Sequence, residues 1–318
     1  MRITLNEVVQ NARNLGYARR FPDRDDPRVR DGLIVPQVFP RFSVGKGASL
    51  FTLGSCFARE LEEQLQEFSL PTRRLVVPTG ERAGRPNGIL NEYNPGTMCQ
   101  RVEYAVKRAT FESAGIAPEN DGLIDLLLAD YVNPATQERL MERRREVDEV
   151  YRALFQCDMV IVTLDAIEAW FDNLAGLYLN RIPPGAFLLA NRDRFELHVM
   201  DFDETQSLLD RLIQGLIAIG LQRIILMVSP VCLESTYSGR DCAVANMYSK
   251  AVLVASAVGL SRLYSQVDYF PSYEIALSAG IESFQPDLLH LREDVSKIIA
   301  ELLVRTYCSG DLRVDTVK

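Results

Sequence analysis

Short apolar runs that alternate with helical patterns constrain the fold of this chain more than any other feature. Three such runs occur, at residues 48–53, 159–164 and 223–228. Their length and composition predict central strands that are buried on both faces. Helical spacing follows the runs, at residues 57–68, 203–220 and 243–257. Because parallel strands are usually joined by right-handed helical crossovers, the sequence predicts one three-layer α/β/α domain with a mostly parallel sheet.

Further patterns complete the predicted domain. Strands are expected at 74–77 and 263–269, and a β-hairpin, inserted in the domain, at 186–190 and 195–200. Helices are expected at 97–114, 137–156 and 293–307. A loop rich in Gly, Pro and Asn spans residues 79–95, and its length suggests a functional role.

The first part of the chain differs in composition from the rest. Residues 1–45 are rich in Arg, Asp and Pro and show little periodicity. We therefore expect an extended N-terminal lead-in over 1–45 and a single folded domain over 46–310.

Charge and cysteine content exclude several classes of function. The formal net charge is −8, so the surface repels phosphate backbones and nucleic-acid binding is not expected. No run reaches the ~20 apolar residues that span a bilayer, and the first residues lack the apolar core of a secretory signal. The 6 cysteines are scattered without a C-x-x-C pair, which argues against a zinc ribbon or a redox dithiol. We expect a cytoplasmic protein that has free thiols and needs no metal or cofactor.

A serine follows the first predicted strand. Sites in open α/β sheets form at the carboxyl ends of strands, and Gly54 with Ser55 stands at such an end. Ser55 has two interpretations. It either caps the next helix through its side chain, or it is a nucleophile close to amides that hold an oxyanion. The adjacent Cys56 is expected to be structural.

The second candidate is an Asp-x-x-His sequence before the last predicted helix. Asp287 lies three residues before His290, a spacing that can place the carboxylate on the imidazole Nδ1. Nε2 is then free to accept a proton from a hydroxyl. The alternative is a helix cap at Asp287 and an ordinary surface histidine. The chain has only 2 histidines, and His198 alternates with apolar residues as a solvent-facing strand residue does.

These residues belong to a wider pattern. Residues 54–58 read Gly-Ser-Cys-Phe-Ala, the motif that names the GSCFA family, which is similar to the SGNH (GDSL-like) hydrolases. The chain resembles this family from about residue 40 to 305. Further blocks follow in the family's order, at residues 93–95, 163–164, 168–170, 176–180, 228–231, 245–250 and 269–274.

The resemblance implies a flavodoxin-like SGNH fold with Ser55 as nucleophile and Asp287 and His290 as its partners. It implies serine-dependent acyl transfer on an ester, and the expected enzyme is an esterase that acts on a small-molecule or glycan ester. Two alternatives stay open: an O-acyltransferase that moves the acyl group to a sugar or other alcohol, and a non-catalytic binding module on the same fold.

This chain also departs from the family pattern. Asp165 stands where the family usually has glycine, which would reshape the site and add a carboxylate that disfavours anionic substrates. The Gly-x-Asn-Asp block of SGNH enzymes is absent, so the expected oxyanion donors are the Ser55 amide and the Asn94 side chain. For Asn94 a turn-forming role is an equal alternative. Glu168 and Trp170 are expected at the substrate pocket, with simple packing as the alternative for Trp170.

Overall fold

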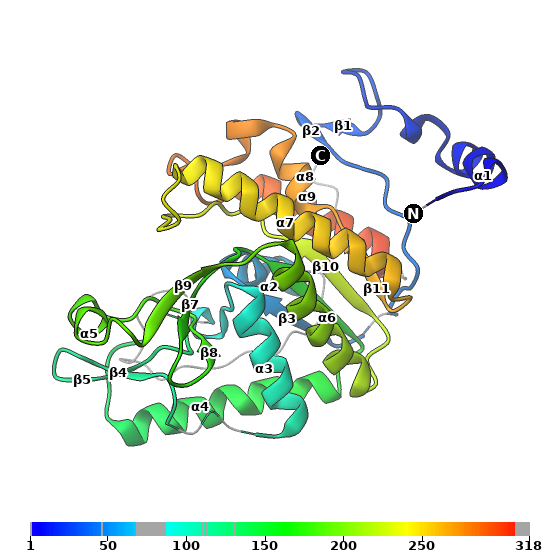
Figure 1. Ribbon diagram of the computed structural model, residues 1–318. Coiled ribbons are helices and arrows are strands. Elements are labelled where there is room, and N and C mark those ends of the chain that lie inside the picture. Colours follow the sequence, from blue (N-terminus) through cyan, green and yellow to red (C-terminus); the bar gives the residue numbers. More distant parts are fainter. Residues whose placement is uncertain are drawn as a thin grey trace.

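A parallel sheet forms the centre of the protein (Figure 1). The computed structural model describes residues 2–45, 47–67, 87–109, 111, 113–129 and 132–308. Four strands pair in the order β11–β10–β6–β3, and every pairing is parallel. Their bounds are Leu50–Gly54 (β3), Met159–Leu164 (β6), Ile224–Val228 (β10) and Val267–Phe270 (β11). The predicted parallel sheet is confirmed; its last strand begins later than expected because the preceding helix runs on to Leu263.

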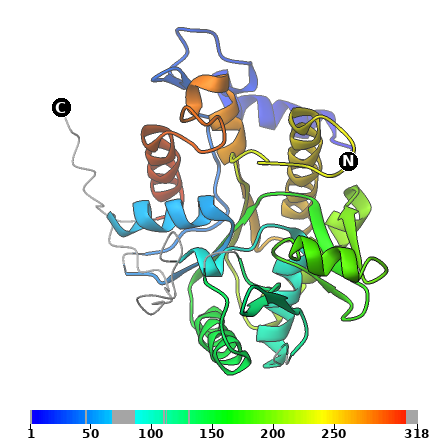
Figure 2. The same ribbon diagram turned by 90° about the vertical axis from the view of Figure 1, so that its left-hand side faces the viewer.

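Helices cover both faces of this sheet. Alternate strand residues point to opposite faces, so Leu53, Val162 and Leu226 enter one core while Ile161 and Met227 enter the other. The first core is closed by α3 (Pro95–Lys107), α6 (Phe202–Ala218) and α7 (Cys242–Leu263). The second is closed by α2 (Cys56–Glu67) and α9 (Glu293–Tyr307), which pack together. Figure 2 shows α2 and α9 on one side of the sheet and α7 on the other, which confirms the three-layer prediction.

Residues 186–190 are not a strand. They lie in helix α5 (Gly185–Ala190), and β9 (Phe195–Val199) pairs instead with β7 (Glu168–Asp172). With β8 (Leu177–Tyr178) these strands form a second, antiparallel sheet in the order β8–β7–β9. The predicted hairpin is therefore wrong. Residues 186–190 contain only Ala, Phe and Leu, whose helix propensity allows a helix, whereas the partner of β9 is supplied from a distant segment.

The N-terminal segment contains a helix that composition did not indicate. Helix α1 (Leu5–Leu15) begins with a capping box, in which the Thr4 hydroxyl accepts from the Glu7 amide and Glu7 accepts from the Thr4 amide. The segment is therefore not extended throughout. It returns to the domain through the hairpin of β1 (Val29–Arg30) and β2 (Leu33–Ile34), where Leu33 enters the second core.

The remaining elements connect these layers. They are η1 (Gly16–Arg19), η2 (Gly88–Leu90), β4 (Ile116–Glu119), β5 (Gly122–Asp125), α4 (Gln137–Tyr151), η3 (Arg152–Phe155), α8 (Ser272–Leu277) and η4 (Gly280–Ser283). The predicted strand at 74–77 and residues 79–86 of the predicted loop lie outside the described residues.

Helix α7 is the most apolar of the long helices. Among the described residues it is the one helix long and apolar enough to cross a membrane, by length and composition only. Core helices of α/β domains can be equally long and apolar. Here α7 packs on β10, β11 and α6, and Leu253, Ala257 and Leu260 lie in the first core.

Candidate active site

The order of strands in the sheet changes direction at β3, which has chain segments added on both of its sides. Strands β6, β10 and β11 are added in sequence order on one side of β3. On its other side Gly54 forms a parallel bridge with Asn91, and the Glu92 amide donates to the Gly54 carbonyl at 2.9 Å. Asn91 precedes β6 in the sequence, so the boundary between β3 and β6 is a topological switch point. Ligands of open α/β sheets bind at such points, beyond the carboxyl ends of the strands.

Gly54 closes β3 at this point, and its conformation and surroundings require glycine. Its φ is +149°, which L side chains rarely adopt. A Cβ atom there would lie 1.9 Å from Thr163 Oγ1 and 2.5 Å from the Thr163 carbonyl oxygen. The main chain of β3 and the Thr163 side chain of β6 therefore touch directly beside Ser55.

Ser55 is fully buried, and its hydroxyl has no hydrogen-bond partner among the described residues. A helix cap requires the side-chain oxygen to accept an amide hydrogen, so the capping interpretation of Ser55 has no support. Leaving a buried hydroxyl unpaired costs about 1–3 kcal/mol. Thr163 Oγ1 and Asn91 Oδ1, which flank Gly54, are also buried without such a partner in the described part of the chain. Polar atoms available to a ligand thus gather at the switch point.

Asp287 and His290 form the predicted pair. His290 Nδ1 lies 2.8 Å from Asp287 Oδ2, and both side chains are partly exposed. Asp287 Oδ1 accepts from the amides of Leu289 and His290, at 2.9 and 3.1 Å. The hydrogen bond to His290, followed by those to the two amides, lowers the pKa of Asp287 to about 2. The carboxylate is therefore ionised at neutral pH and leaves Nε2 as the imidazole nitrogen able to accept a proton.

The His290 segment is tied to the carboxyl edge of the sheet. The amide of Cys232, beyond the end of β10, donates to the Leu289 carbonyl at 3.3 Å. Leu291 packs in the same core as Phe57, two residues after Ser55. The Ser55 hydroxyl forms no hydrogen bond to His290 in this structure. The structure thus joins Asp287 to His290, while their contact with Ser55 stays a prediction.

Asn94 serves the main chain. Its Oδ1 accepts from the Thr97 amide at 2.9 Å, and its Nδ2 donates to the Leu179 carbonyl at 3.4 Å. Asn94 therefore caps α3, with Pro95 in the first helical turn. Both polar atoms are engaged, and this supports the turn-forming interpretation over an oxyanion donor.

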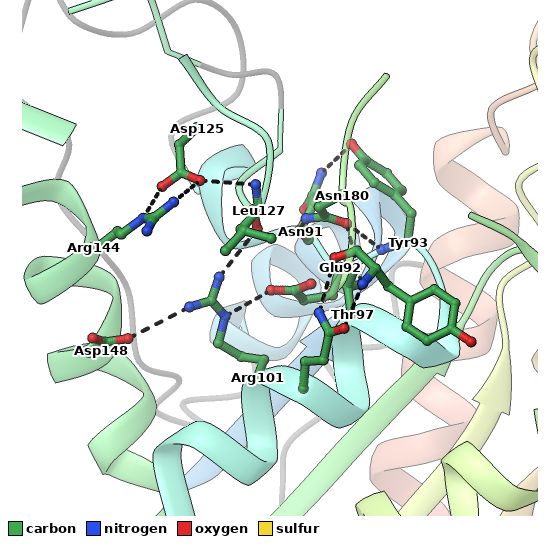
Figure 3. Close-up of polar contacts among 12 residues, drawn as sticks. Asn91, Glu92, Tyr93, Thr97, Arg101, Asp125, Leu127, Arg144, Asp148 and Asn180 are labelled. Carbon is green, nitrogen blue, oxygen red and sulfur yellow. Dashed lines mark hydrogen bonds and ion pairs between the residues drawn. The ribbon is translucent and has the colours of Figure 1, made fainter. Parts of the chain in front are cut away.

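Asn91 and Asn180 are polar residues of this edge to which sequence reasoning gave no role. Asn180 Oδ1 accepts from the Tyr93 amide at 3.1 Å, and Asn180 Nδ2 donates to the Asn91 carbonyl (Figure 3). Asn91 Nδ2 donates to the Tyr93 hydroxyl at 3.1 Å. Both asparagines are buried, so the segment facing Gly54 is fixed from two sides. The only sequence signal was their place in the Asn-rich loop and in a family block.

A buried charge network anchors the same segment to two helices. Arg101 of α3 donates from Nε to Glu92 at 3.1 Å and lies 3.6 Å from Asp148 of α4 (Figure 3). Its Nη2 donates to the Leu127 carbonyl at 3.3 Å. Glu92 follows Asn91 directly, so this network fixes Asn91 against the end of β3.

Glu168 and Trp170 lie on β7, and the loop between β10 and α7 (residues 229–241) contacts both. Glu168 accepts from the Thr236 hydroxyl at 2.6 Å and from the Tyr237 amide at 3.4 Å. The Trp170 ring meets the Tyr237 ring edge-on, with centroids 6.1 Å apart, and packs against a small third core. Glu168 also lines a pocket, whereas Trp170 has packing contacts.

Asp165 is paired with a buried lysine. Lys250 of α7 is fully buried, and its Nζ donates to the Asp165 carbonyl oxygen at 2.6 Å and to Oδ1 at 3.2 Å. Lys250 and Asp165 thus form an ion pair inside the protein. Because the lysine balances the carboxylate, Asp165 does not present the uncompensated negative charge that the sequence suggested.

The other histidine lies in an aromatic group. The His198 ring stacks on Phe171 with centroids 4.7 Å apart and meets Tyr178 edge-on at 5.4 Å. We expected His198 to face solvent. Instead it is half-buried, because the rings of Phe171 and Tyr178, from strands β7 and β8 of the same sheet, cover it. Across the described residues, no group of three or more His, Cys, Asp or Glu side chains could hold a metal ion.

The fold is a three-layer α/β domain whose candidate ligand site lies at the carboxyl edge of the parallel sheet. The GSCFA family model matches residues 49–302, well over half of the chain, and the chain belongs to the GSCFA family.

The solved structures that are similar to this chain include two esterases. A Clostridium thermocellum family 3 carbohydrate esterase is 12% identical with a TM-score of 0.36, covering 82% of this chain and 94% of that one. A catalytic mutant of an acetylxylan esterase from Geobacillus stearothermophilus is 14% identical with a TM-score of 0.34, covering 83% and 96%. No curated protein matches the sequence.

Proposed function

We propose that this protein is an enzyme that transfers acyl groups from esters through Ser55, with His290 and Asp287 as its partners, and that it acts as an esterase. The observation that carries the proposal is the buried, unbonded hydroxyl of Ser55 at the switch point of the sheet. A polar group left unpaired in this way needs an explanation. A nucleophile whose hydroxyl bonds only to the substrate explains the missing partner, whereas a helix cap does not.

The reaction follows from the roles of the three side chains. Ser55 Oγ attacks the ester carbonyl carbon while His290 Nε2 takes the hydroxyl proton. Asp287 holds the Nδ1 proton and stabilises the imidazolium. The bond from the carbonyl carbon to the alcohol oxygen then breaks, and His290 returns the proton to that oxygen. Water, deprotonated by His290, attacks the acyl-serine and releases the carboxylic acid and Ser55.

The developing oxyanion requires hydrogen-bond donors. The Ser55 amide is the first, because it lies beyond a strand end at the start of α2. Asn94 is committed to its cap, so Asn91, which bridges to Gly54, is the better-placed asparagine. Asn91 Nδ2 would then donate its hydrogen bond to the oxyanion and no longer to the Tyr93 hydroxyl.

A second candidate function is O-acyl transfer to a sugar or other alcohol. Ser55 is fully buried, so a substrate reaches it only after the surrounding segments open. Shielding of an acyl-serine from water favours a bound alcohol as the acceptor. Ester hydrolysis and O-acyl transfer both pass through the acyl-serine. A non-catalytic binding module would form no acyl-serine.

We also propose a cytoplasmic location and a neutral small-molecule or glycan ester as substrate. All six cysteines are free thiols, as in reducing compartments. The net charge of −8 disfavours nucleic acid as a partner.

A fluorophosphonate probe tests the proposal. We expect one adduct on Ser55, located by peptide mass spectrometry, and no adduct in the Ser55→Ala variant. Hydrolysis of p-nitrophenyl acetate should be lost in the same variant. Labelling at another residue, or turnover that survives Ser55→Ala, would show that Ser55 is not the nucleophile.

A further inference from the structure

The loop of residues 229–241 connects the candidate base to a pocket that the proposed reaction does not use. At one end of the loop, the Cys232 amide donates to the carbonyl of Leu289, next to His290. Midway along the loop, Thr236 and Tyr237 hydrogen-bond to Glu168 at the start of β7. Ser238 and Arg240, from the second half of the loop, line the pocket together with Glu168. The same loop therefore contacts both the His290 segment and the pocket.

The pocket encloses about 280 Å³. This lies just below the ~300–1,000 Å³ range of ligand pockets, and suits one small ring rather than an extended chain. Ile167, Val199 and Ala245 form its apolar lining, and the Tyr248 side chain adds an aromatic ring. The Arg240 guanidinium lies 5.8 Å from the centroid of that ring, which orients the tyrosine.

The remaining lining is polar and has balanced charge. Glu168, Ser238 and Arg240 supply a carboxylate, a hydroxyl and a guanidinium. Ser238 Oγ lies 2.7 Å from Thr236 Oγ1, which in turn donates to Glu168 at 2.6 Å. These groups are held in place by one another before a ligand arrives. They offer both donors and acceptors, and the carboxylate offsets the single cation.

A lining that combines apolar and aromatic groups with a charge-balanced set of donors and acceptors matches one ligand chemistry. A pyranose ring has C–H faces for Tyr248 and Ile167 and hydroxyl edges for Glu168 and Ser238. An anion would face the Glu168 carboxylate, and a purely apolar group would leave the polar side chains without partners. We propose that this pocket binds a neutral sugar ring.

The sugar pocket deepens the proposed function. Only the position of the sugar within the substrate rests on that proposed function. His290 returns its proton to the leaving alcohol, so the alcohol part of the ester lies on the His290 side. The loop of residues 229–241 leads from that side to the pocket. The sugar is therefore on the alcohol side of the ester bond, or is the acceptor if the enzyme transfers the acyl group.

Sugar binding can be measured without catalysis. The full-length Ser55→Ala protein is titrated with methyl β-glucopyranoside and methyl β-xylopyranoside, and with cyclohexanol and glucose 6-phosphate as apolar and anionic comparisons. Trp170 is the only tryptophan, and it contacts Tyr237 next to Ser238. Its fluorescence therefore reports on the pocket. We expect saturable binding of at least one methyl glycoside, and weaker or no binding of the comparison compounds.

Variants locate the binding. Tyr248→Ala should weaken the glycoside about tenfold, since it removes an aromatic contact. Glu168→Gln should weaken it through lost hydroxyl contacts. Tyr17→Ala is the matched control, because Tyr17 also pairs with an arginine, Arg28 at 5.5 Å, in the N-terminal segment. Circular dichroism on every variant checks the fold.

The outcomes separate this proposal from the proposed function. Saturable glycoside binding that Tyr248→Ala weakens and Tyr17→Ala leaves unchanged supports the sugar site, whatever the fluorophosphonate result. No saturable binding of either glycoside, tighter binding of glucose 6-phosphate, or binding indifferent to Tyr248→Ala overturns it, even if Ser55 is labelled. If glycosides bind and Ser55 is not labelled, the sugar site stands and the acyl-transfer mechanism fails.

Discussion

Thr163 occupies the space that a side chain at Gly54 would need. The two residues are paired in register between β6 and β3, and a Cβ atom at position 54 would approach the Thr163 hydroxyl and carbonyl oxygens more closely than real Cβ atoms approach any atom. The close approach places the end of β6 directly beside Ser55. The first residue of the Gly-Ser-Cys-Phe-Ala motif is therefore required by packing and backbone conformation, independently of any catalytic role.

Gly54→Ala should destabilise the fold and abolish activity. The methyl group collides with main-chain oxygen as well as with a side chain, so the cost should exceed about 3 kcal/mol. Urea unfolding measures it. The control is Gly45→Ala, since nothing lies within 4 Å of a Cβ there. A Gly54→Ala protein as stable as the control would contradict the packing described.

Ser55→Ala should keep or raise stability while it removes activity, because the hydroxyl has no hydrogen bond to lose and its unpaired burial is itself unfavourable. Ser249→Ala is the matched control. Ser249 is equally buried, but its Oγ accepts from the Ile167 amide at 3.1 Å, so its loss should cost about 1–3 kcal/mol. Melting temperature and ester turnover are read on the same preparations. A destabilised but active Ser55→Ala protein would defeat the enzyme assignment.

Asp287→Asn should lower the turnover rate by orders of magnitude with little change in structure. The amide can leave the wrong imidazole tautomer facing Ser55, a change that costs about 10⁴ in kcat in a serine protease. Stopped-flow or steady-state ester hydrolysis measures the loss. Asp294→Asn is a suitable control, since Asp294 pairs with Arg292 at the surface and not with a histidine. Full activity in Asp287→Asn would move the orienting role to another group.

The pKa of Asp287 sets a pH window for its contribution to stability. The hydrogen bond from His290 and those from two amides lower this pKa from 3.8 to about 2 in the folded protein. The folded state therefore favours the carboxylate. Its contribution should be complete above about pH 4 and disappear as the pH falls to about 2. The effect should be small, because water screens the exposed pair.

Urea midpoints of wild type and Asp287→Asn, compared from pH 7 to pH 2, measure this contribution. The difference should be constant at the upper end and shrink below pH 4. A difference that grows on acidification has the wrong sign for a depressed pKa. Between pH 5 and 8 Asp287 stays ionised, so any change of reaction rate there must come from another group.

Lys250→Met should be among the more destabilising single changes. It leaves the Asp165 carboxylate, whose side chain is only 13% exposed, without its cation, and breaking a buried pair costs about 3–5 kcal/mol. The double variant Lys250→Met, Asp165→Asn should recover most of this loss. Lys107→Met is the exposed control and should cost below about 1 kcal/mol, since its pair with Glu103 is long and solvated. Equal effects of the two lysine substitutions would contradict a buried role for Lys250.

The sequence by itself determined the central sheet, several of its helices and the family. The strands β3, β6 and β10 were predicted because a strand buried on both faces needs a continuous apolar run, and such a run can be read locally. Helix α9 was predicted with its bounds, Glu293–Tyr307, because its apolar spacing is regular. The pairing of Asp287 with His290 was also predictable, since both residues lie on one turn.

Contacts between distant segments were decided only by the tertiary structure. Residues 186–190 are helical and do not pair with β9, because the strand that pairs with β9 is β7, more than twenty positions earlier. Asn94 became a cap, and Asn180 came to hold the segment that faces Gly54. Lys250 balances a carboxylate 85 positions away, and the sugar pocket joins three separate stretches of chain. Local periodicity reports only which face of an element is buried, whereas the partner of each polar group depends on how the layers pack.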